Sequence, residues 1–128
     1  MSRPKGNRKP CDQRRARQRL VDARQFLEAA EVMEAPDVVA TNAIHAAIAA
    51  ADAITCKALG ERSADSSHPA AVDLLRRVDA GLATALKRAL DRKTQAAYES
   101  EDVSAAVAES CVKWARRLLA AAEARFES

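Results

Sequence analysis

An alanine-rich apolar run between two helix-terminating residues is the feature that most constrains the fold. The run extends from Asp37 to Leu59, with Pro36 before it and Gly60 after it. Proline disfavours helical geometry in the residue before it, and glycine readily takes the left-handed conformation that ends a helix. Because small side chains let neighbouring backbones approach closely, we expect residues 37–59 to form the most enclosed helix of the fold.

Apolar periodicity predicts further helices on both sides of this run. The first is expected from about residue 12, where Asp12 is a suitable N-cap, to about residue 33. Others are expected at about 68–78, at about 81–97, and from a Ser104 cap to about residue 126. The chain has only three glycines and four prolines, so almost no strand is expected. The predicted fold class is all-α, an up-and-down bundle of about five helices.

The last predicted helix has one apolar stripe. The stripe contains Trp114, the only tryptophan, and we expect this side chain in the core. Its basic neighbours are expected to form an ordinary solvated face: Lys113, Arg116 and Arg117.

Basic residues are concentrated at the N-terminus. Residues 1–19 contain eight lysines and arginines against a single acid, Asp12, although the net charge of the whole chain is only +3. A basic arm on a mildly acidic body is typical of a protein that contacts a polyanion, and the alternative is a solvated tail that only aids solubility. We expect residues 1–12 to be a basic disordered arm and residues 13–128 to be a single helical domain.

The cysteines and histidines indicate neither a disulfide framework nor a metal site. Cys11, Cys56 and Cys111 show no paired spacing, and reduced thiols in the cytoplasm are the simplest interpretation. Neither histidine has a paired-cysteine partner, so no metal and no cofactor is expected. No apolar run is long enough for a membrane span, and the basic N-terminus lacks the apolar stretch of a signal peptide.

A polar loop between two helical runs contains the residues best suited to chemistry. It extends from Gly60 to Pro69 and holds Arg62 and His68 with five residues between them. Histidine exchanges protons near neutral pH, and arginine binds phosphate through two parallel hydrogen bonds. A helix beginning at His68 would add free backbone N–H groups, which favour phosphate. The pair therefore suits chemistry on a phosphodiester, and the alternative is a solvated loop that holds both residues by chance.

Polar residues also lie along one face of the predicted central helix. Asn42, His45, Asp52 and Cys56 are spaced so that they align on one side. Polar groups on an enclosed helix are costly unless they are paired. They form either a satisfied core network or the wall of an active-site groove or dimer interface, and the sequence leaves both open.

Several segments together carry a family resemblance over roughly residues 15–126. They are Ala40–His45, the Arg62-to-His68 motif, Ala71–Leu75, Arg92–Thr94, Ala97–Tyr98 and Ser104. In these segments the chain resembles the HEPN family of small all-α proteins, in its actinobacterial-type branch. Many active members carry Asn, Asp or His where this chain has Ser63, and the nucleotidyltransferase-paired toxins end the motif with His-any-Tyr, whereas Pro69 and Ala70 follow His68 here.

The resemblance implies a homodimeric, metal-independent endoribonuclease of the toxin or defence type. Arg62 and His68 of both subunits would then meet at one cleft, where His68 transfers protons and Arg62 stabilises the transition state. The implied supporting residues are Ser63, Asp65, Ser66, Asn42, His45 and Asp52, and the expected RNA contacts are Arg8, Lys9, Arg14, Arg15 and Lys93. The implied partners are RNA, a second copy of the chain and an antitoxin or regulatory protein, with no membrane.

Other members of that family have lost catalysis, which leaves two alternatives. One is a non-catalytic module that binds RNA, a nucleotide or a partner protein. The other is a purely structural helical dimer with no effect on nucleic acid.

Overall fold

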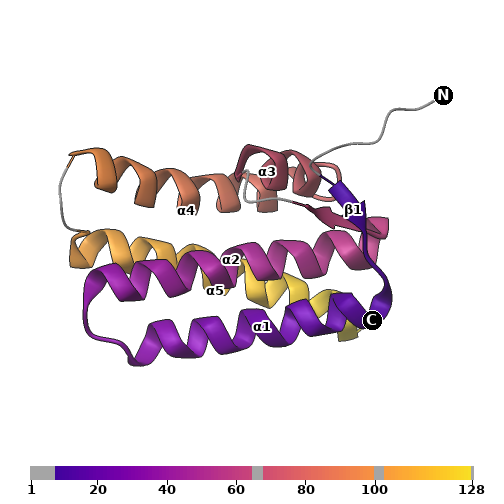
Figure 1. Cartoon of the computed structure of the whole chain (residues 1–128), viewed down its shortest axis with the longest axis horizontal. Helices are drawn as coiled ribbons and strands as arrows, with labels where there is room; N and C mark the ends of the chain where they lie inside the picture. The colour runs from indigo at the N-terminus through magenta and orange to yellow at the C-terminus, as the bar shows by residue number, and fades with distance from the viewer. Residues whose placement is uncertain (1–7, 65–67, 100–102, 128) are drawn as a thin grey trace.

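The all-α prediction is confirmed by a bundle of five helices with one very small sheet (Figure 1). The computed structural model describes residues 8–64, 68–99 and 103–127, and it describes only the backbone of residues 68 and 93–99. The elements are β1 (Arg8–Pro10), α1 (Gln13–Val32), α2 (Pro36–Leu59), β2 (Glu61–Ser63), α3 (His68–Arg76), α4 (Ala80–Glu99) and α5 (Ala105–Glu127).

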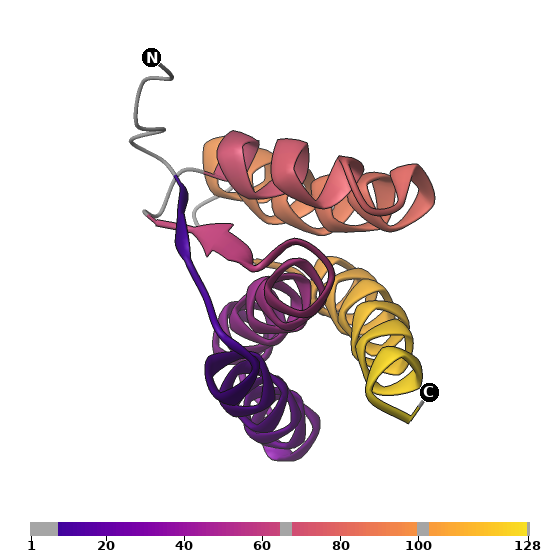
Figure 2. The ribbon, with the colours of Figure 1, turned by 90° about the vertical axis from the view of Figure 1, so that its right-hand side faces the viewer.

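The helices are arranged around α2. This helix packs against both α1 and α5, and α4 packs against α5 and α3. Figure 2 views α1, α2 and α5 nearly end-on, whereas α3 and α4 run across them. The bundle therefore has one layer of three roughly aligned helices, with a shorter helical pair lying across it.

The interior of α2 consists mostly of alanine, as predicted. Side chains such as Ala43, Ala47 and Ala50 are fully buried, and they let α1 and α5 approach closely. This helix is also long and apolar enough to cross a membrane by length and composition, but most of that stretch is buried within the bundle. Its apolar character is therefore accounted for by its central position in the core.

The helix ends follow the predicted signals. Asp12 caps α1, because its side chain accepts a hydrogen bond from the Arg15 backbone N–H at 2.8 Å. Ser104 caps α5 in the same way, accepting from the Val107 N–H at 3.2 Å. Gly60 ends α2 with φ 70°, in the left-handed region. Ser66 and Ser67, the caps expected for α3, lie outside the described residues.

The sheet was not predicted. β1 pairs antiparallel with β2, and Lys9 lies opposite Arg62. Since β1 falls within the arm that was expected to be disordered, that prediction is wrong for Arg8–Pro10, which belong to the fold. Residues 1–7 of the arm lie outside the described part. β2 likewise replaces the start of the predicted polar loop.

A disulfide joins Cys11 to Cys56. The prediction of reduced thiols is therefore wrong for these two residues, while Cys111 is free and buried. The two partners are 45 residues apart, so no local spacing could reveal them. Disulfides persist mainly in oxidising compartments, and the predicted cytoplasmic location thus loses the support that reduced thiols would provide.

Candidate functional site

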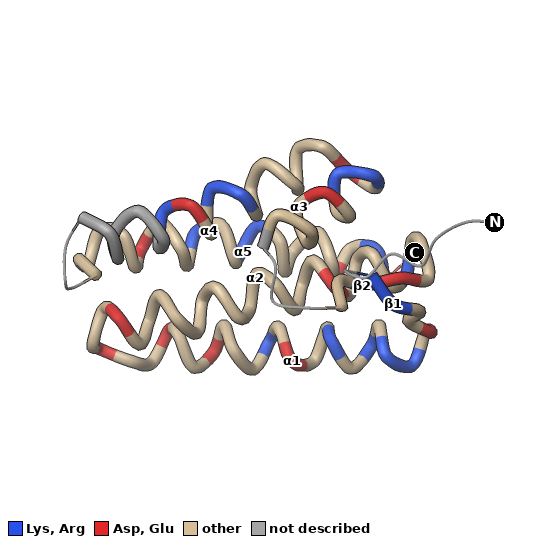
Figure 3. Tube along the Cα trace, turned by 45° about the horizontal axis from the view of Figure 1, so that its top comes forward, with Lys and Arg blue, Asp and Glu red and all other residues tan. Residues whose placement is uncertain are grey.

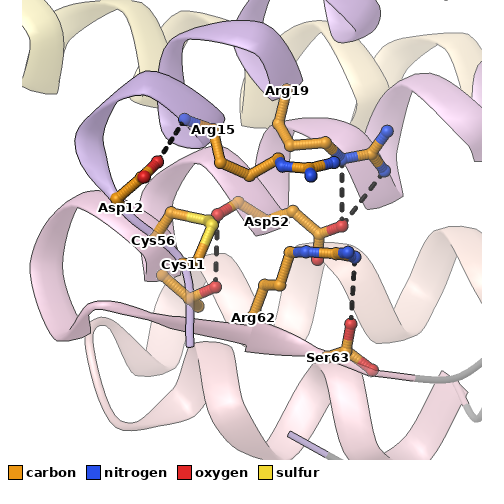
Figure 4. Close-up of a disulfide and its surroundings, with 9 residues drawn as sticks. Cys11, Asp12, Arg15, Arg19, Asp52, Cys56, Arg62 and Ser63 are labelled. Atoms are coloured by element: carbon orange, nitrogen blue, oxygen red, sulfur yellow. Dashed lines mark hydrogen bonds and ion pairs between the residues drawn. A yellow bond between two sulfur atoms is a disulfide. The ribbon is translucent and has the colours of Figure 1, made fainter. Parts of the chain in front are cut away.

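The disulfide end of the bundle brings together segments from four elements. Cys11 follows β1 and precedes α1, whereas Cys56 lies in the last turn of α2. The Cys11 backbone N–H donates to the Gly60 carbonyl at 2.8 Å, just before β2 begins. Figure 4 shows the Arg62 side chain reaching back from β2 toward Asp52 and Arg19.

Asp52 is the buried centre of this region. It is 4% exposed, and its Oδ2 accepts from Nε of Arg19 at 3.1 Å and lies 3.0 Å from Nη2 of the same guanidinium. Arg19 also contacts Oδ2 of Asp22 through Nη1 at 3.0 Å. Two carboxylates therefore hold the Arg19 guanidinium in place.

Three cations surround the one buried carboxylate. Burial raises the pKa of Asp52 above its ordinary value of 3.8, and the nearby charges of Arg19, Arg62 and Lys9 act in the opposite direction. When Asp52 is ionised, these cations still exceed it in number. The region therefore keeps an excess of positive charge.

Arg62 is the cation that is least engaged. It is partly buried, and its Nη1 lies 3.5 Å from the Ser63 carbonyl, at the long limit for a hydrogen bond. Within the described residues no carboxylate forms a salt bridge with it. Its guanidinium therefore retains donors for a ligand. Ser63 itself is buried, and its described contact with Arg62 is made through its backbone carbonyl.

The polar face of α2 does not form one site. The Asn42 amide donates to the Val38 carbonyl at 3.0 Å, and the exposed His45 ring stacks near Phe26 with centroids 5.1 Å apart. His45 precedes Asp52 by seven residues, which places it about 10 Å away along the helix axis. Asn42 and His45 are thus apart from Arg62, and their predicted supporting role there is wrong.

The core-network interpretation holds for the C-terminal half of that face. Asp52 is paired with Arg19, and Cys56 is in the disulfide. Among the described residues no buried side-chain nitrogen or oxygen lacks a hydrogen-bond partner.

Three other predicted residues cannot be placed fully. Asp65 and Ser66 lie outside the described residues. His68 is the first residue of α3, and Lys93 lies in α4, but the side chains of both are outside the described part. The convergence of Arg62 and His68 is therefore not shown.

The predicted RNA-contact residues near the N-terminus do gather at this end. Arg8 is 3.4 Å from Glu61 across the sheet, and Lys9 is exposed beside it. Arg14 and Arg15 are exposed and line a shallow depression in the first turn of α1. Figure 3 shows positive charge at this end of α1 and negative charge at its other end.

This charge order opposes the helix dipole. The first turn of α1 contains no acidic residue and the last turn contains no basic residue. Cations near a helix N-terminus weaken the helix by a few tenths of a kcal/mol each, to about 1 kcal/mol. The arginines at the start of α1 therefore do not serve helix stability.

Sequence reasoning missed two features of the molecule's charged surface. Arg19 was not a candidate site residue, although it directly follows the Ala16 turn of the buried stripe. Trp114 was expected in the core, but it is only partly buried and has three cations near its ring. The distances to its ring centroid are 4.9 Å for Lys113, 5.7 Å for Arg88 and 6.0 Å for Arg117.

No protein-family model matches this chain, and comparison with curated proteins and with solved structures finds no match either.

Proposed function

We propose that this chain is an RNA-binding helical module. The contact surface is the cationic end, formed by Arg8, Lys9, Arg14, Arg15, Arg19 and Arg62. The observation that carries the proposal is the excess of cations around a single buried carboxylate, Asp52.

The charges of the cationic end are arranged for an external anion. Asp52 is already engaged with Arg19, so a phosphate would replace water around Arg62 and Lys9 without breaking an ion pair of either. An arginine presents a planar fork that matches two phosphate oxygens, whereas a lysine acts as a mobile point charge. The two lie opposite each other on the sheet, which is the spacing that adjacent phosphates of one strand require of a binding surface.

The α1 N-terminus adds to the same attraction. Its backbone N–H groups carry partial positive charge, and Arg14 and Arg15 increase the local positive potential. A charge arrangement that costs helix stability is explained if it serves the binding of an anion. The choice of RNA over DNA comes from the HEPN resemblance of the Arg62-to-His68 segment.

The binding proposal is tested by fluorescence anisotropy with a labelled single-stranded RNA across a salt series. We expect Arg14→Gln combined with Arg15→Gln to weaken binding and to reduce the slope of log K against log salt by about 1. The matched control is Arg92→Gln, an exposed arginine in the second half of α4, which runs away from β1 (Figure 1).

Two results would contradict this proposal. One is absence of binding at low salt, and the other is an equal loss in the Arg92→Gln control. Equal affinity for DNA of the same sequence would remove RNA preference and leave a general nucleic-acid binder.

A second candidate function is metal-independent cleavage of RNA by a homodimer. The observation that favours it is that β2, which carries Arg62, contacts α3, whose first residue is His68. A base would take the 2′-hydroxyl proton, the oxygen would attack the adjacent phosphate, and an acid would protonate the leaving 5′-oxygen. One chain supplies one motif histidine, so two copies would be needed for both proton transfers.

This candidate is tested by incubating RNA with the protein in EDTA. Cleavage should leave a 2′,3′-cyclic phosphate and a 5′-hydroxyl, and it should disappear in His68→Ala. His45→Ala is the matched control, because His45 is the other histidine and lies away from Arg62. If the wild type and His68→Ala leave RNA equally intact, the nuclease candidate is wrong and the binding proposal is unaffected.

A further inference from the structure

The position of β1 depends on a covalent link more than on the sheet. β1 and β2 have three residues each, and an isolated two-stranded sheet is marginal in water. Pro10 contributes no backbone N–H to the ladder. The Arg8–Glu61 contact, at 3.4 Å, is loose for a charge-assisted hydrogen bond. The Cys11–Cys56 disulfide is therefore the main restraint on this strand.

The same disulfide lies beside the cationic end. Cys56 follows Asp52 by one helical turn on the same face of α2. Cys11 follows Lys9 by two residues, and Lys9 lies opposite Arg62 in the sheet. Figure 4 shows the disulfide, Asp52, Arg19 and Arg62 within one small region. A change at the sulfur atoms would reach the cations through only a few residues.

We propose that the Cys11–Cys56 disulfide is a redox latch on the cationic end. In the oxidised protein it holds β1 on β2, and its reduction releases β1 and weakens RNA binding. This inference rests on the proposed RNA-binding function.

The reduction is a thiol–disulfide exchange with an external thiol such as a small dithiol. Its thiolate attacks the Cys11 sulfur, because Cys11 is 7% exposed and Cys56 is fully buried. The S–S bond breaks, and the electron pair goes to the Cys56 sulfur, which takes a proton. A second external thiol then releases Cys11 as a thiol, so that two external thiols become one disulfide. Local opening of the short β1 strand gives the reductant access.

Release of β1 lowers affinity through loss of preorganisation. In the oxidised protein, Arg8 and Lys9 are fixed beside Arg62 before RNA arrives. After reduction, RNA must order this strand as it binds, and that ordering opposes association. We expect RNA binding by the reduced protein to be about fivefold or more weaker, because immobilising even two flexible side chains costs that much.

The main test compares oxidised and dithiothreitol-reduced protein in RNA anisotropy at one salt concentration. Reduction should weaken binding, and reoxidation should restore it. The double variant Cys11→Ser, Cys56→Ser should bind as weakly as reduced wild type and should not respond to reductant. Cys111→Ala is the matched control, because Cys111 is a free buried cysteine and its loss leaves the latch intact. Equal affinity of the oxidised and reduced wild type would overturn the latch.

A second readout does not depend on RNA. Amide hydrogen exchange should become faster at residues 8–11 and 61–63 on reduction, while the helices keep their circular dichroism. Unchanged exchange at these residues would overturn the latch, and so would loss of all helical signal, since the disulfide would then hold the whole fold. If the oxidised protein binds no RNA, the proposed function fails, and the exchange measurement still decides whether the disulfide controls β1.

Discussion

Arg19 and Asp52 are joined by two contacts that end on the same carboxylate oxygen. Nε and Nη2 of Arg19 lie 3.1 and 3.0 Å from Oδ2 of Asp52. The Arg19 side chain is 21% exposed and the Asp52 side chain 6% exposed, so the pair connects the surface of α1 to the interior of α2. Asp52 lies on the most enclosed helix, where an unpaired charge would be costly.

Removing the arginine should therefore destabilise the fold. Arg19→Met leaves Asp52 buried without its main partner, and we expect the free energy of unfolding to fall by about 2–3 kcal/mol. Urea denaturation at neutral pH measures this change. The control is Arg24→Met, which breaks the more exposed pair of α1 with Glu123, 2.8 Å apart. That loss should be below about 1 kcal/mol, and equal losses would show that burial of Asp52 is not the cause.

The titration of Asp52 should give a measurable pH dependence of stability. Burial raises the pKa of Asp52 above 3.8, although Arg19 acts against the shift. The folded state then holds the proton more tightly than the unfolded state. The stabilising contribution of this carboxyl is therefore fully present below pH 3.8 and is lost as the pH rises through the higher folded-state pKa.

Asp52→Asn provides the test, because an amide does not titrate. The unfolding free energy of the wild type minus that of Asp52→Asn should decrease as the pH rises from about 3 to about 7. Urea denaturation of both proteins at several pH values gives this difference. A difference that increases with pH would mean that the attraction of Arg19 outweighs the burial of the carboxylate.

The sequence was informative wherever a local signal decided the structure. Asp12 and Ser104 are good N-caps by residue type, and Gly60 alone can take the left-handed conformation at no steric cost. The α1 stripe, Ala16, Leu20, Ala23, Leu27 and Ala30, is buried as its periodicity predicts. In each case the deciding interaction lies within a few residues, so a single chain contains enough information.

The features that were missed depend on residues far apart in the chain. The Cys11–Cys56 link and the Arg19–Asp52 pair each join positions separated by more than thirty residues. β1 contains Pro10 and has only three residues, so it gives no strand periodicity. For the candidate site, the sequence indicated Arg62 and the N-terminal arginines, but it grouped Asn42 and His45 with Asp52 because they share a helix face. Distance along that face separates them.

The disulfide should contribute to stability as well as to the position of β1. It closes a loop between residues 45 apart, and links of this length restrict the unfolded chain by about 2–4 kcal/mol. The double variant Cys11→Ser, Cys56→Ser should lose about that much unfolding free energy. Urea denaturation of reduced wild type should give the same value as the oxidised double variant. A reduced wild type as stable as the oxidised protein would show that the link adds no stability.

Gly60 should be the most sensitive backbone position near the cationic end. Its φ of 70° lies in the left-handed region, and a Cβ there would meet nothing nearer than the Cys11 carbonyl oxygen at 4.0 Å. There is room for a side chain, so the cost of substitution comes from backbone conformation alone. Gly60→Ala should lower the free energy of unfolding by about 1 kcal/mol, and Gly60→Val should lower it by more, because a β-branched residue fits this region poorly.

The control for this position is Gly60→Asn, since asparagine tolerates the left-handed conformation better than alanine does. We expect Gly60→Asn to lose less stability than Gly60→Ala in urea denaturation, although asparagine is the larger side chain. An order of loss that follows side-chain size, with Asn worse than Ala, would show that packing against Cys11 limits this turn. Because β2 begins at the next residue, the ranking also tells whether the turn that places Arg62 over Asp52 is set by the backbone of Gly60 or by its neighbours.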